Sequence, residues 1–155
     1  MSQDATVPKL AQLTSTIEAL ALTAPVVVAS SVKVYRDEGL SEHLIEKALR
    51  ESGVVVVVEP LVELALRDQS GSEWLCDAEL VVRVKVNQSR NRDTAHGGAG
   101  VDIYALCASI MGVMTRSRHP GGEFAKLADK PLALSQFDKG LWSYDLSFTK
   151  EAFYL

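Results

Sequence analysis

Several features that mark other classes of protein are scarce or missing in this sequence. Cys76 and Cys107 are the only two cysteines in 155 residues, which gives no disulfide framework and is typical of a reducing compartment. No apolar run approaches the ~20 residues that a membrane-spanning helix needs. Residues 1–6 lack the basic and apolar regions of a signal peptide. We therefore expect a soluble protein that is made in the cytoplasm and has no contact with a membrane.

Basic residues are not in excess. The formal net charge is −4, and the lysines and arginines are scattered along the chain. Because nucleic-acid recognition needs a concentrated positive surface, we expect no sequence-specific binding of nucleic acid.

Catalytic motifs are also missing. The glycine-rich segment 96–100 is similar to the oxyanion-hole loop of some esterases, but no Gly-x-Ser-x-Gly nucleophile elbow accompanies it. The same glycines lack the third glycine of a dinucleotide fingerprint, and no Walker lysine follows them. His43, His96 and His119 fall in three different predicted elements without metal-ligand spacing. We expect no enzymatic activity, no cofactor and no metal ion. A small-molecule-binding domain, or an enzyme that uses the loop around His96, is the less favoured alternative.

The composition is that of one ordinary globular domain spanning residues 1–155. With 47% apolar and 23% charged residues, such a chain can bury roughly 70% of its unfolded surface. Helical spacing of apolar residues predicts helices over 9–23, over 41–52 with Ser41 as N-cap and a Leu40–Ile45 staple, and over 101–115. β-Branched runs predict strands over 26–35 and 54–58. Residues 61–67 favour a strand, 69–72 a turn, and 116–122 a break that is followed by a connector.

The run of valines from Val54 to Val58 is apolar on both faces of a strand. Such a strand is covered on both sides, either by its own chain or by helices on one side and a neighbouring subunit on the other. The demand for cover is one reason to expect a ring of several copies.

Two amphipathic strands stand out. From Trp74 to Val86 apolar residues alternate with polar ones over thirteen positions, which predicts a strand of ~40 Å that projects from the domain or bends. Cys76 lies on its apolar side, and Cys107 lies on the apolar side of the helix over 101–115, so both are predicted core residues. The polar side carries Asp77, Glu79, Arg83 and Lys85. These residues favour either cross-strand charge pairing or an electrostatic strip for a neighbouring copy.

The second amphipathic strand ends the sequence. Trp142, Tyr144, Leu146 and Phe148 share one side, and the pattern slips around Lys150–Ala152, as it would at a β-bulge. We expect this strand to lie inside the sheet and to close the domain. We also expect Trp142 and Tyr144 to be core residues that pack against the helix over 101–115.

Residues 87–100 are polar and rich in glycine, which predicts a mobile loop. Arg90 and Arg92 in this loop are candidates for an assembly contact, and a solvated loop that touches nothing is the alternative. The order of elements, with short turns between strands, predicts an α+β fold. We expect a mainly antiparallel, twisted sheet of about four to five strands, with helices packed on one face.

Taken in order, these parts resemble the tail terminator proteins of long-tailed bacteriophages. The matching parts are an N-terminal helix before the first strand, the long amphipathic strand from Trp74 to Val86, a polar loop into the helix over 101–115, and a closing strand over 140–148. The resemblance covers residues 10–153 as pattern and order. Gly140-Leu141-Trp142-Ser143 and the strand–loop–helix segment are similar residue by residue, whereas residues 53–67 are longer than in the family.

The resemblance implies a structural virion protein of the phage tail or neck. Members of that family form a hexameric ring that caps the tail tube, stops its polymerisation and presents a surface for head joining. The implied partners are other copies of the same chain, the tail tube protein and the head–tail connector or stopper protein. Another head–tail joining or minor tail protein of similar fold is the alternative within the same class.

Overall fold

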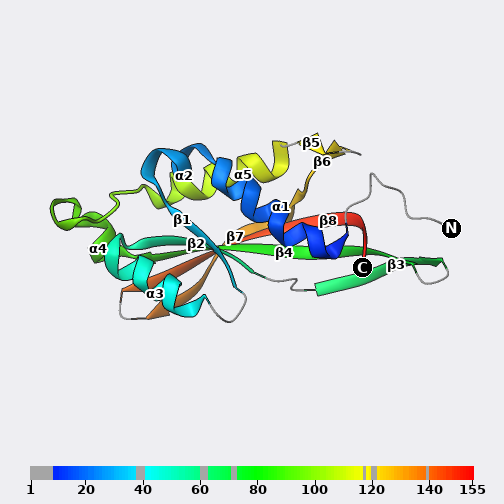
Figure 1. Cartoon of the computed structure of the whole chain (residues 1–155), viewed down its shortest axis with the longest axis horizontal. Helices are drawn as coiled ribbons and strands as arrows, with labels where there is room; N and C mark the ends of the chain where they lie inside the picture. Colours follow the sequence, from blue (N-terminus) through cyan, green and yellow to red (C-terminus); the bar gives the residue numbers. More distant parts are fainter. Residues whose placement is uncertain are drawn as a thin grey trace.

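The computed structural model describes residues 9–37, 41–59, 63–70, 73–116, 118–119, 122–138 and 140–155. These residues form an α+β fold with helices on both faces of one large sheet (Figure 1). The α+β class predicted from the sequence is therefore confirmed. In chain order the elements are α1 (Leu10–Thr23), α2 (Pro25–Ser30), β1 (Lys33–Arg36), α3 (Glu42–Glu51), β2 (Val54–Val58), β3 (Glu63–Ser70), β4 (Glu73–Asn87), α4 (Gln88–Arg92), the 3-10 helix η1 (Thr94–His96), α5 (Ile103–Arg116), β5 (Arg118–His119), β6 (Gly122–Glu123), β7 (Lys126–Asp138) and β8 (Leu141–Tyr154).

The main sheet has six strands in the order β1-β2-β4-β8-β7, with β3 paired to β4 beside that path. β1 and β2 are parallel, whereas the pairs β2–β4, β3–β4, β4–β8 and β7–β8 are antiparallel. The predicted, mainly antiparallel arrangement is confirmed. The sheet exceeds the expected four to five strands because β7 forms from residues that were predicted to be a connector.

The central strand is unusually long, as predicted. β4 has 15 residues, which corresponds to ~50 Å at ~3.4 Å per residue. Residues 82–86 pair with β2, and residues 73–79 pair with β3. Residues 73–79 pair with β3 on one side, and residues 75–79 pair with the end of β8 on the other. We name β3 together with residues 73–79, at the right of Figure 1, the β3–β4 arm. In the arm, β3 confirms the strand favoured over 61–67, although residues 61–62 lie outside the described part. Gln69 and Ser70, expected in a turn, end β3, while residues 71–72 are not described.

The strand predicted over residues 26–35 is wrong in its first half. Pro25 does end α1, since that helix stops at Thr23, but it also occupies the first turn of a new helix, α2. Proline suits this position because its fixed φ is helical and its missing N–H would have no partner there. Ser31 then takes a left-handed φ of 51°, and the strand begins at Lys33.

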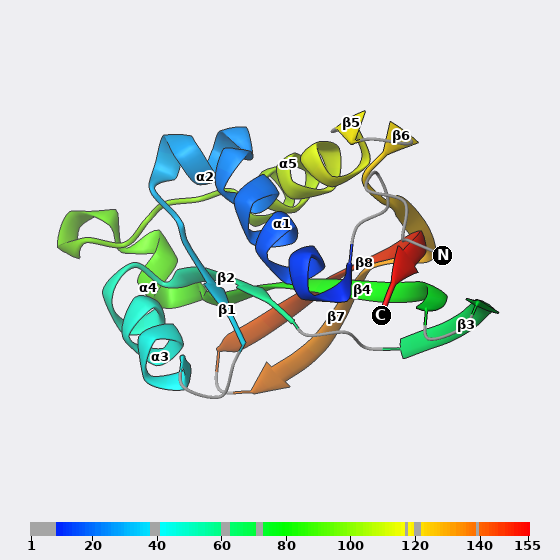
Figure 2. The same ribbon diagram turned by 45° about the vertical axis from the view of Figure 1, so that its right-hand side comes forward.

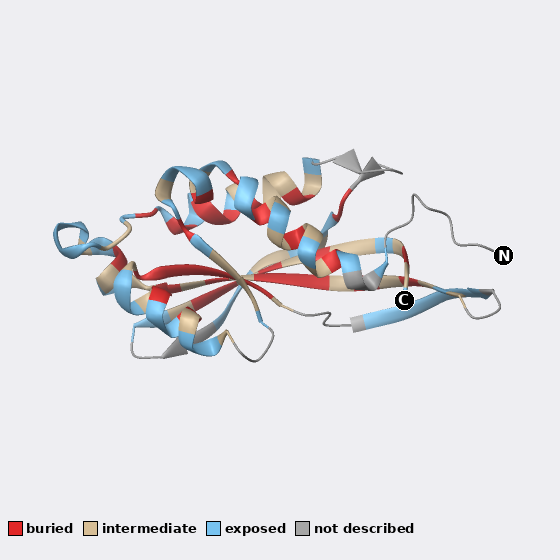
Figure 3. Cartoon of the chain, viewed as in Figure 1, coloured by how far each residue is buried: buried red, intermediate tan, exposed pale blue. Residues whose placement is uncertain are grey.

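Helices cover both faces of the sheet, so the prediction of helices on one face is wrong. α1, α2 and α5 lie on one face and α3 lies on the other (Figures 1 and 2). Val54, Val56 and Val58 point into the main core below α1 and α5. Val55 and Val57 point to the opposite face and form a second cluster with Ile45 and Ala48 of α3. The chain itself therefore covers both faces of β2, and the valine run gives no reason to expect cover from a neighbouring subunit. Figure 3 shows the fully buried β2 beside the buried middle of β4.

The other predicted helices are confirmed, with one difference in capping. The Ser41 hydroxyl does not cap α3; it donates to the carbonyl oxygen of Arg36 at 2.6 Å, and Leu40 of the proposed staple lies outside the described residues. In α5, Asp102 accepts backbone N–H bonds from Tyr104 and Ala105 at 3.1 and 3.2 Å, as an N-cap does. Ile103, Leu106, Cys107, Ile110 and Met114 of α5 are buried as predicted.

The C-terminal strand lies inside the sheet, between β4 and β7. Tyr144, Leu146 and Phe148 are buried, which confirms their predicted side. Trp142 is only half-buried at the edge of the main core. The ring of Tyr144 meets Tyr104 of α5 edge-on, with the centroids 5.8 Å apart. The predicted bulge is also present, because the register shifts where Asp77 faces Glu151 and Ala152, and Ala152 has a positive φ of 56°.

Candidate functional site

The segment 87–100, predicted to be an irregular mobile loop, is folded. It contains α4 and η1, and the Asn91 side chain is buried. That side chain donates to the carbonyl oxygen of Val101 at 2.9 Å and accepts from the Val101 N–H at 3.0 Å. Gly98 passes so close to α4 that a Cβ there would lie 2.0 Å from the carbonyl oxygen of Arg90. The segment thus folds back on α4, at the left end of Figure 1.

The side chain of Arg90 stabilises the fold of residues 87–100. Its Nε donates to the carbonyl oxygens of Arg50 and Glu51, both at 2.9 Å, and its Nη2 donates to the carbonyl oxygen of His96 at 2.5 Å. The first two acceptors are the last carbonyls of α3, where a positive charge suits the helix dipole. The Arg90 guanidinium is therefore engaged within the chain, whereas Arg92 is exposed.

The His96 side chain lies at the surface. Its ring is 77% exposed, and its Nδ1 lies 2.8 Å from Oδ1 of Asp93. The loop around His96 therefore has the character of a surface turn.

Arg83, predicted on the polar side of β4, bridges two carboxylates from neighbouring strands. Its Nη1 lies 3.2 Å from Oε1 of Glu59, and its Nε lies 3.3 Å from Oδ1 of Asp145. These contacts are not aligned as hydrogen bonds, since Glu59 Oε1 and Arg83 Nε are buried without a hydrogen-bond partner. Burial raises the pKa of the Glu59 carboxyl, although Arg83 acts in the opposite direction. For Arg83 the structure shows cross-strand charge pairing, and Lys85 lies on the same side of β4, two residues further along.

Asp77 and Glu79 lie at the base of the arm, where β8 bulges. Asp77 Oδ1 accepts a hydrogen bond from the N–H of Ala152 at 2.8 Å, which satisfies the backbone at the bulge. Asp77 Oδ2 lies 3.5 Å from Nε of Arg67 on β3. Glu79 lines a shallow pocket of about 300 Å³ with Asp77 and residues of β8. The six predicted residues therefore do not form one site. Arg90 and Arg92 lie at one end of the molecule, Asp77 and Glu79 lie towards the other, and Arg83 and Lys85 lie between them.

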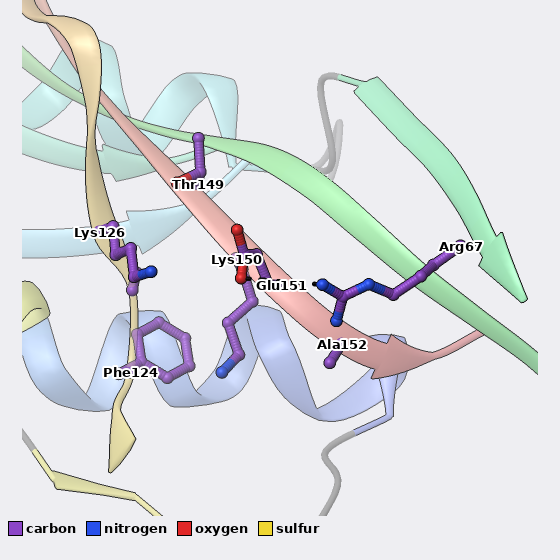
Figure 4. A pocket seen from close by; sticks show the side chains of 8 residues that line it. Arg67, Phe124, Lys126, Thr149, Lys150, Glu151 and Ala152 are labelled. Carbon is purple, nitrogen blue, oxygen red and sulfur yellow. Dashed lines mark ion pairs between the residues drawn. The ribbon is translucent and has the colours of Figure 1, made fainter. Parts of the chain in front are cut away.

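A second pocket at the bulge was not predicted. Its volume is about 280 Å³, and it lies between the start of β7, the end of β8 and Arg67 of the arm (Figure 4). Lys150 Nζ lies 5.2 Å from the centre of the Phe124 ring, and Arg67 Nη2 lies 4.0 Å from Oε2 of Glu151. The one sequence signal that could have indicated this pocket is Lys150, because it interrupts the apolar side of β8 between Phe148 and Phe153.

The arm itself exposes apolar side chains. Leu64, Leu66 and Trp74 are 37%, 52% and 38% exposed, and the described side chains of β3 are all exposed (Figure 3). Leu64 and Leu66 pair with Ala78 and Cys76, which belong to the main core, so they lie on the same face of the sheet as that core. An apolar patch on a projecting hairpin is typical of a protein–protein contact.

The described residues offer no group of three or more His, Cys, Asp and Glu side chains placed to hold a metal ion. No helix in the described ranges is long and apolar enough to cross a membrane. Both cysteines are buried, and burial raises the pKa of the Cys107 thiol to about 12. Cys76 and Cys107 are core residues, as predicted.

Comparison with known proteins finds little at the level of sequence. No protein-family model matches the chain, and no curated protein matches it. Among solved structures, a chain from the virion of a native gene transfer agent particle is similar in fold. The two chains share 14% identity at a TM-score of 0.46, and the alignment covers 93% of this chain and 91% of the other.

Proposed function

We propose that this protein is a structural virion protein of a phage-like tail or neck, of the tail terminator type. In this role, copies of the chain form a ring that caps the tail tube, ends its polymerisation and offers a surface for head joining. The proposal rests on the sequence resemblance over residues 10–153 and on the β3–β4 arm.

The arm is the observation that favours an assembly role. Its outer end projects beyond α1 in Figure 1, and it exposes Leu64, Leu66 and Trp74. Because these side chains are 37–52% exposed, burying the remaining area in a partner contributes ~1 kcal/mol each. In a ring built from heterologous contacts, an arm of one copy can meet the body of the next, and every copy makes the same contact once.

The experiment is capping of tail tubes assembled from the tube protein of the same particle. Addition of the protein should stop tube growth, and electron microscopy should show a ring at the tube end. Leu66→Lys should abolish ring formation and capping while the melting temperature stays close to that of wild type. Leu22→Lys is the matched control, because Leu22 is an exposed leucine of α1, 48% exposed.

Three results would count against the proposal. Tubes that grow to uncontrolled length in the presence of the wild-type protein would remove the terminator role. Binding to the head connector but not to tube ends would favour the alternative, a head–tail joining protein. Capping by Leu66→Lys at the wild-type level would show that the arm does not form the contact between copies.

A further inference from the structure

The pocket at the β8 bulge has an unusual concentration of positive charge for an acidic chain. Three cationic side chains line it, from three different strands, together with one carboxylate, Glu151. Arg67 Nη2 already pairs with that carboxylate at 4.0 Å. The other lining residues are Phe124, Ala125, Lys126, Thr149, Lys150 and Ala152.

Lys150 is placed where a strand of this kind normally carries an apolar residue. It follows the buried Phe148 by two positions, on the side of β8 that faces the main core. Within the described part of the chain its ammonium group has no ion-pair partner, and it lies over the Phe124 ring, 5.2 Å from the ring centre. Burial lowers the pKa of Lys150, as expected for a partly desolvated cation, and the neighbouring Glu151 carboxylate offsets this only in part. A negative group from outside the chain would compensate this charge.

The local backbone fixes the position of Lys150. Ala152 has a left-handed φ of 56°, which is uncommon for a residue other than glycine, and its N–H is held by Asp77 Oδ1 at 2.8 Å. β-Bulges re-aim the side chains beside them. Here the bulge, formed by Glu151 and Ala152, lies directly after Lys150. In Figure 4 Lys150 extends along the Phe124 ring while Glu151 is joined to Arg67.

The shape of the pocket favours a carboxylate over a nucleic-acid phosphate. Phe124, Ala125 and Ala152 form short apolar walls, which suit the stem of an aspartate or glutamate side chain. A nucleic acid presents a continuous row of phosphates and needs a run of cations along its path. Next to this pocket, Asp77 and Glu79 line the adjoining depression, so the cations do not continue as a run there.

We propose that this pocket is a carboxylate-binding site, which receives an aspartate or glutamate side chain from an acidic segment of another polypeptide. Lys150 and Lys126 supply the charge, the buried Phe124 ring supports the Lys150 side chain, and Arg67 pairs with Glu151. The proposal does not depend on the tail role, because the pocket can be tested on the isolated chain with a peptide.

The test is a nuclear magnetic resonance titration of the ¹⁵N-labelled full chain. The probe is the capped peptide acetyl-Ala-Ala-Glu-Glu-Ala-Ala-amide, compared with its Gln-Gln counterpart and with a short oligothymidylate. We expect the Glu peptide to shift the amide signals of Lys126 and of residues 149–152, and the Gln peptide to leave them in place. Lys126→Met/Lys150→Met should weaken binding of the Glu peptide at least tenfold. Lys130→Met, on an exposed lysine of β7 outside the pocket, should leave binding unchanged.

Several outcomes would overturn the proposal. Equal shifts with the Glu and Gln peptides would show that charge is not recognised. Tighter binding of the oligothymidylate at these residues would make the pocket a phosphate site. An inward-pointing lysine can also protect an open sheet edge from aggregation. If Lys150→Met self-associates while the wild-type chain shows no shift with the Glu peptide, protection of the edge is the function of Lys150.

Discussion

Replacing Arg90 with Met should destabilise the fold, although the sequence marks Arg90 as a surface contact. The substitution keeps most of the aliphatic stem and removes the guanidinium. It thereby removes the donors to the carbonyl oxygens of Arg50, Glu51 and His96. The two bonds from Nε share one N–H and count as about one.

The expected loss follows from these contacts. Hydrogen bonds from a charged donor contribute ~1.5–3 kcal/mol each, and two effective bonds are lost. The Arg90 side chain is 26% exposed, so water can reach part of the site and replace some of the lost bonding. The ion pair with Asp93, at 3.9 Å, adds little because exposed pairs contribute ~0–1 kcal/mol. We therefore expect a loss of ~2 kcal/mol in the free energy of unfolding, or a fall of ~4–8 °C in melting temperature.

Urea denaturation at neutral pH, followed by circular dichroism, measures this loss. Arg92→Met is the matched control, because Arg92 lies two residues away on the same short helix and is exposed; it should change the stability by less than ~0.5 kcal/mol. Hydrogen exchange should also accelerate in residues 93–100 of the Arg90 variant. If the two variants unfold at the same urea concentration, the internal role of Arg90 is refuted and its assignment to an assembly surface becomes the better explanation.

Two further predictions concern the core. Leu146→Ala should lower the free energy of unfolding by ~3 kcal/mol, because Leu146 is fully buried, whereas Leu134→Ala on the exposed side of β7 should cost less than ~0.5 kcal/mol; equal urea midpoints would contradict the register of β8. Burial raises the pKa of Tyr144 to about 12, so the neutral phenol is favoured in the folded state. The stability that Tyr144 contributes is then complete below pH ~10, the unfolded value, and is lost as the pH rises from ~10 to 12. Absorbance at 295 nm should show one tyrosine that titrates late, which Tyr144→Phe removes; a late phase that survives in this variant would refute the assignment.

Elements with strong periodic patterns could be predicted from the sequence. α5, β4 and β8 each show a clear alternation or helical spacing, because each presents one continuous apolar side to the same core. Even the bulge in β8 was visible as a change of phase at residues 150–152. Periodicity does not state which element covers a face, however, and so the placement of α3 opposite α1 and α5 could not be predicted.

β7 was missed for a physical reason. It is an edge strand, and Leu127 and Leu134 are 45% and 50% exposed, so burial imposes no clean alternation on it. Pro131 and the charged residues beside it fall where the register shifts between Leu127 and Leu132. Proline is tolerated at such an edge, where its missing N–H does not break a ladder. The same features make a sequence of this kind indistinguishable from a connector.

The local structure of residues 87–100 could not be predicted for a different reason. Its order comes from Arg90, which reaches carbonyls some forty residues earlier in the chain, at Arg50 and Glu51, and from Asn91, which bonds to Val101. Backbone carbonyls carry no signal in a sequence, so a polar segment held by them has the composition of a mobile loop.

Lys150 shows the opposite case, in which a break in a pattern is the signal. A charged residue on the apolar side of a strand costs free energy unless a partner compensates it. Among the described residues, its ammonium group lies over the ring face of Phe124 and forms no ion pair with a carboxylate. The positions that disagree with the pattern of their own element are therefore the ones to test first for a contact with another molecule. In this chain those positions lie at the end of β8 and at the base of the arm. They do not lie in residues 87–100, which contain Arg90 and Arg92.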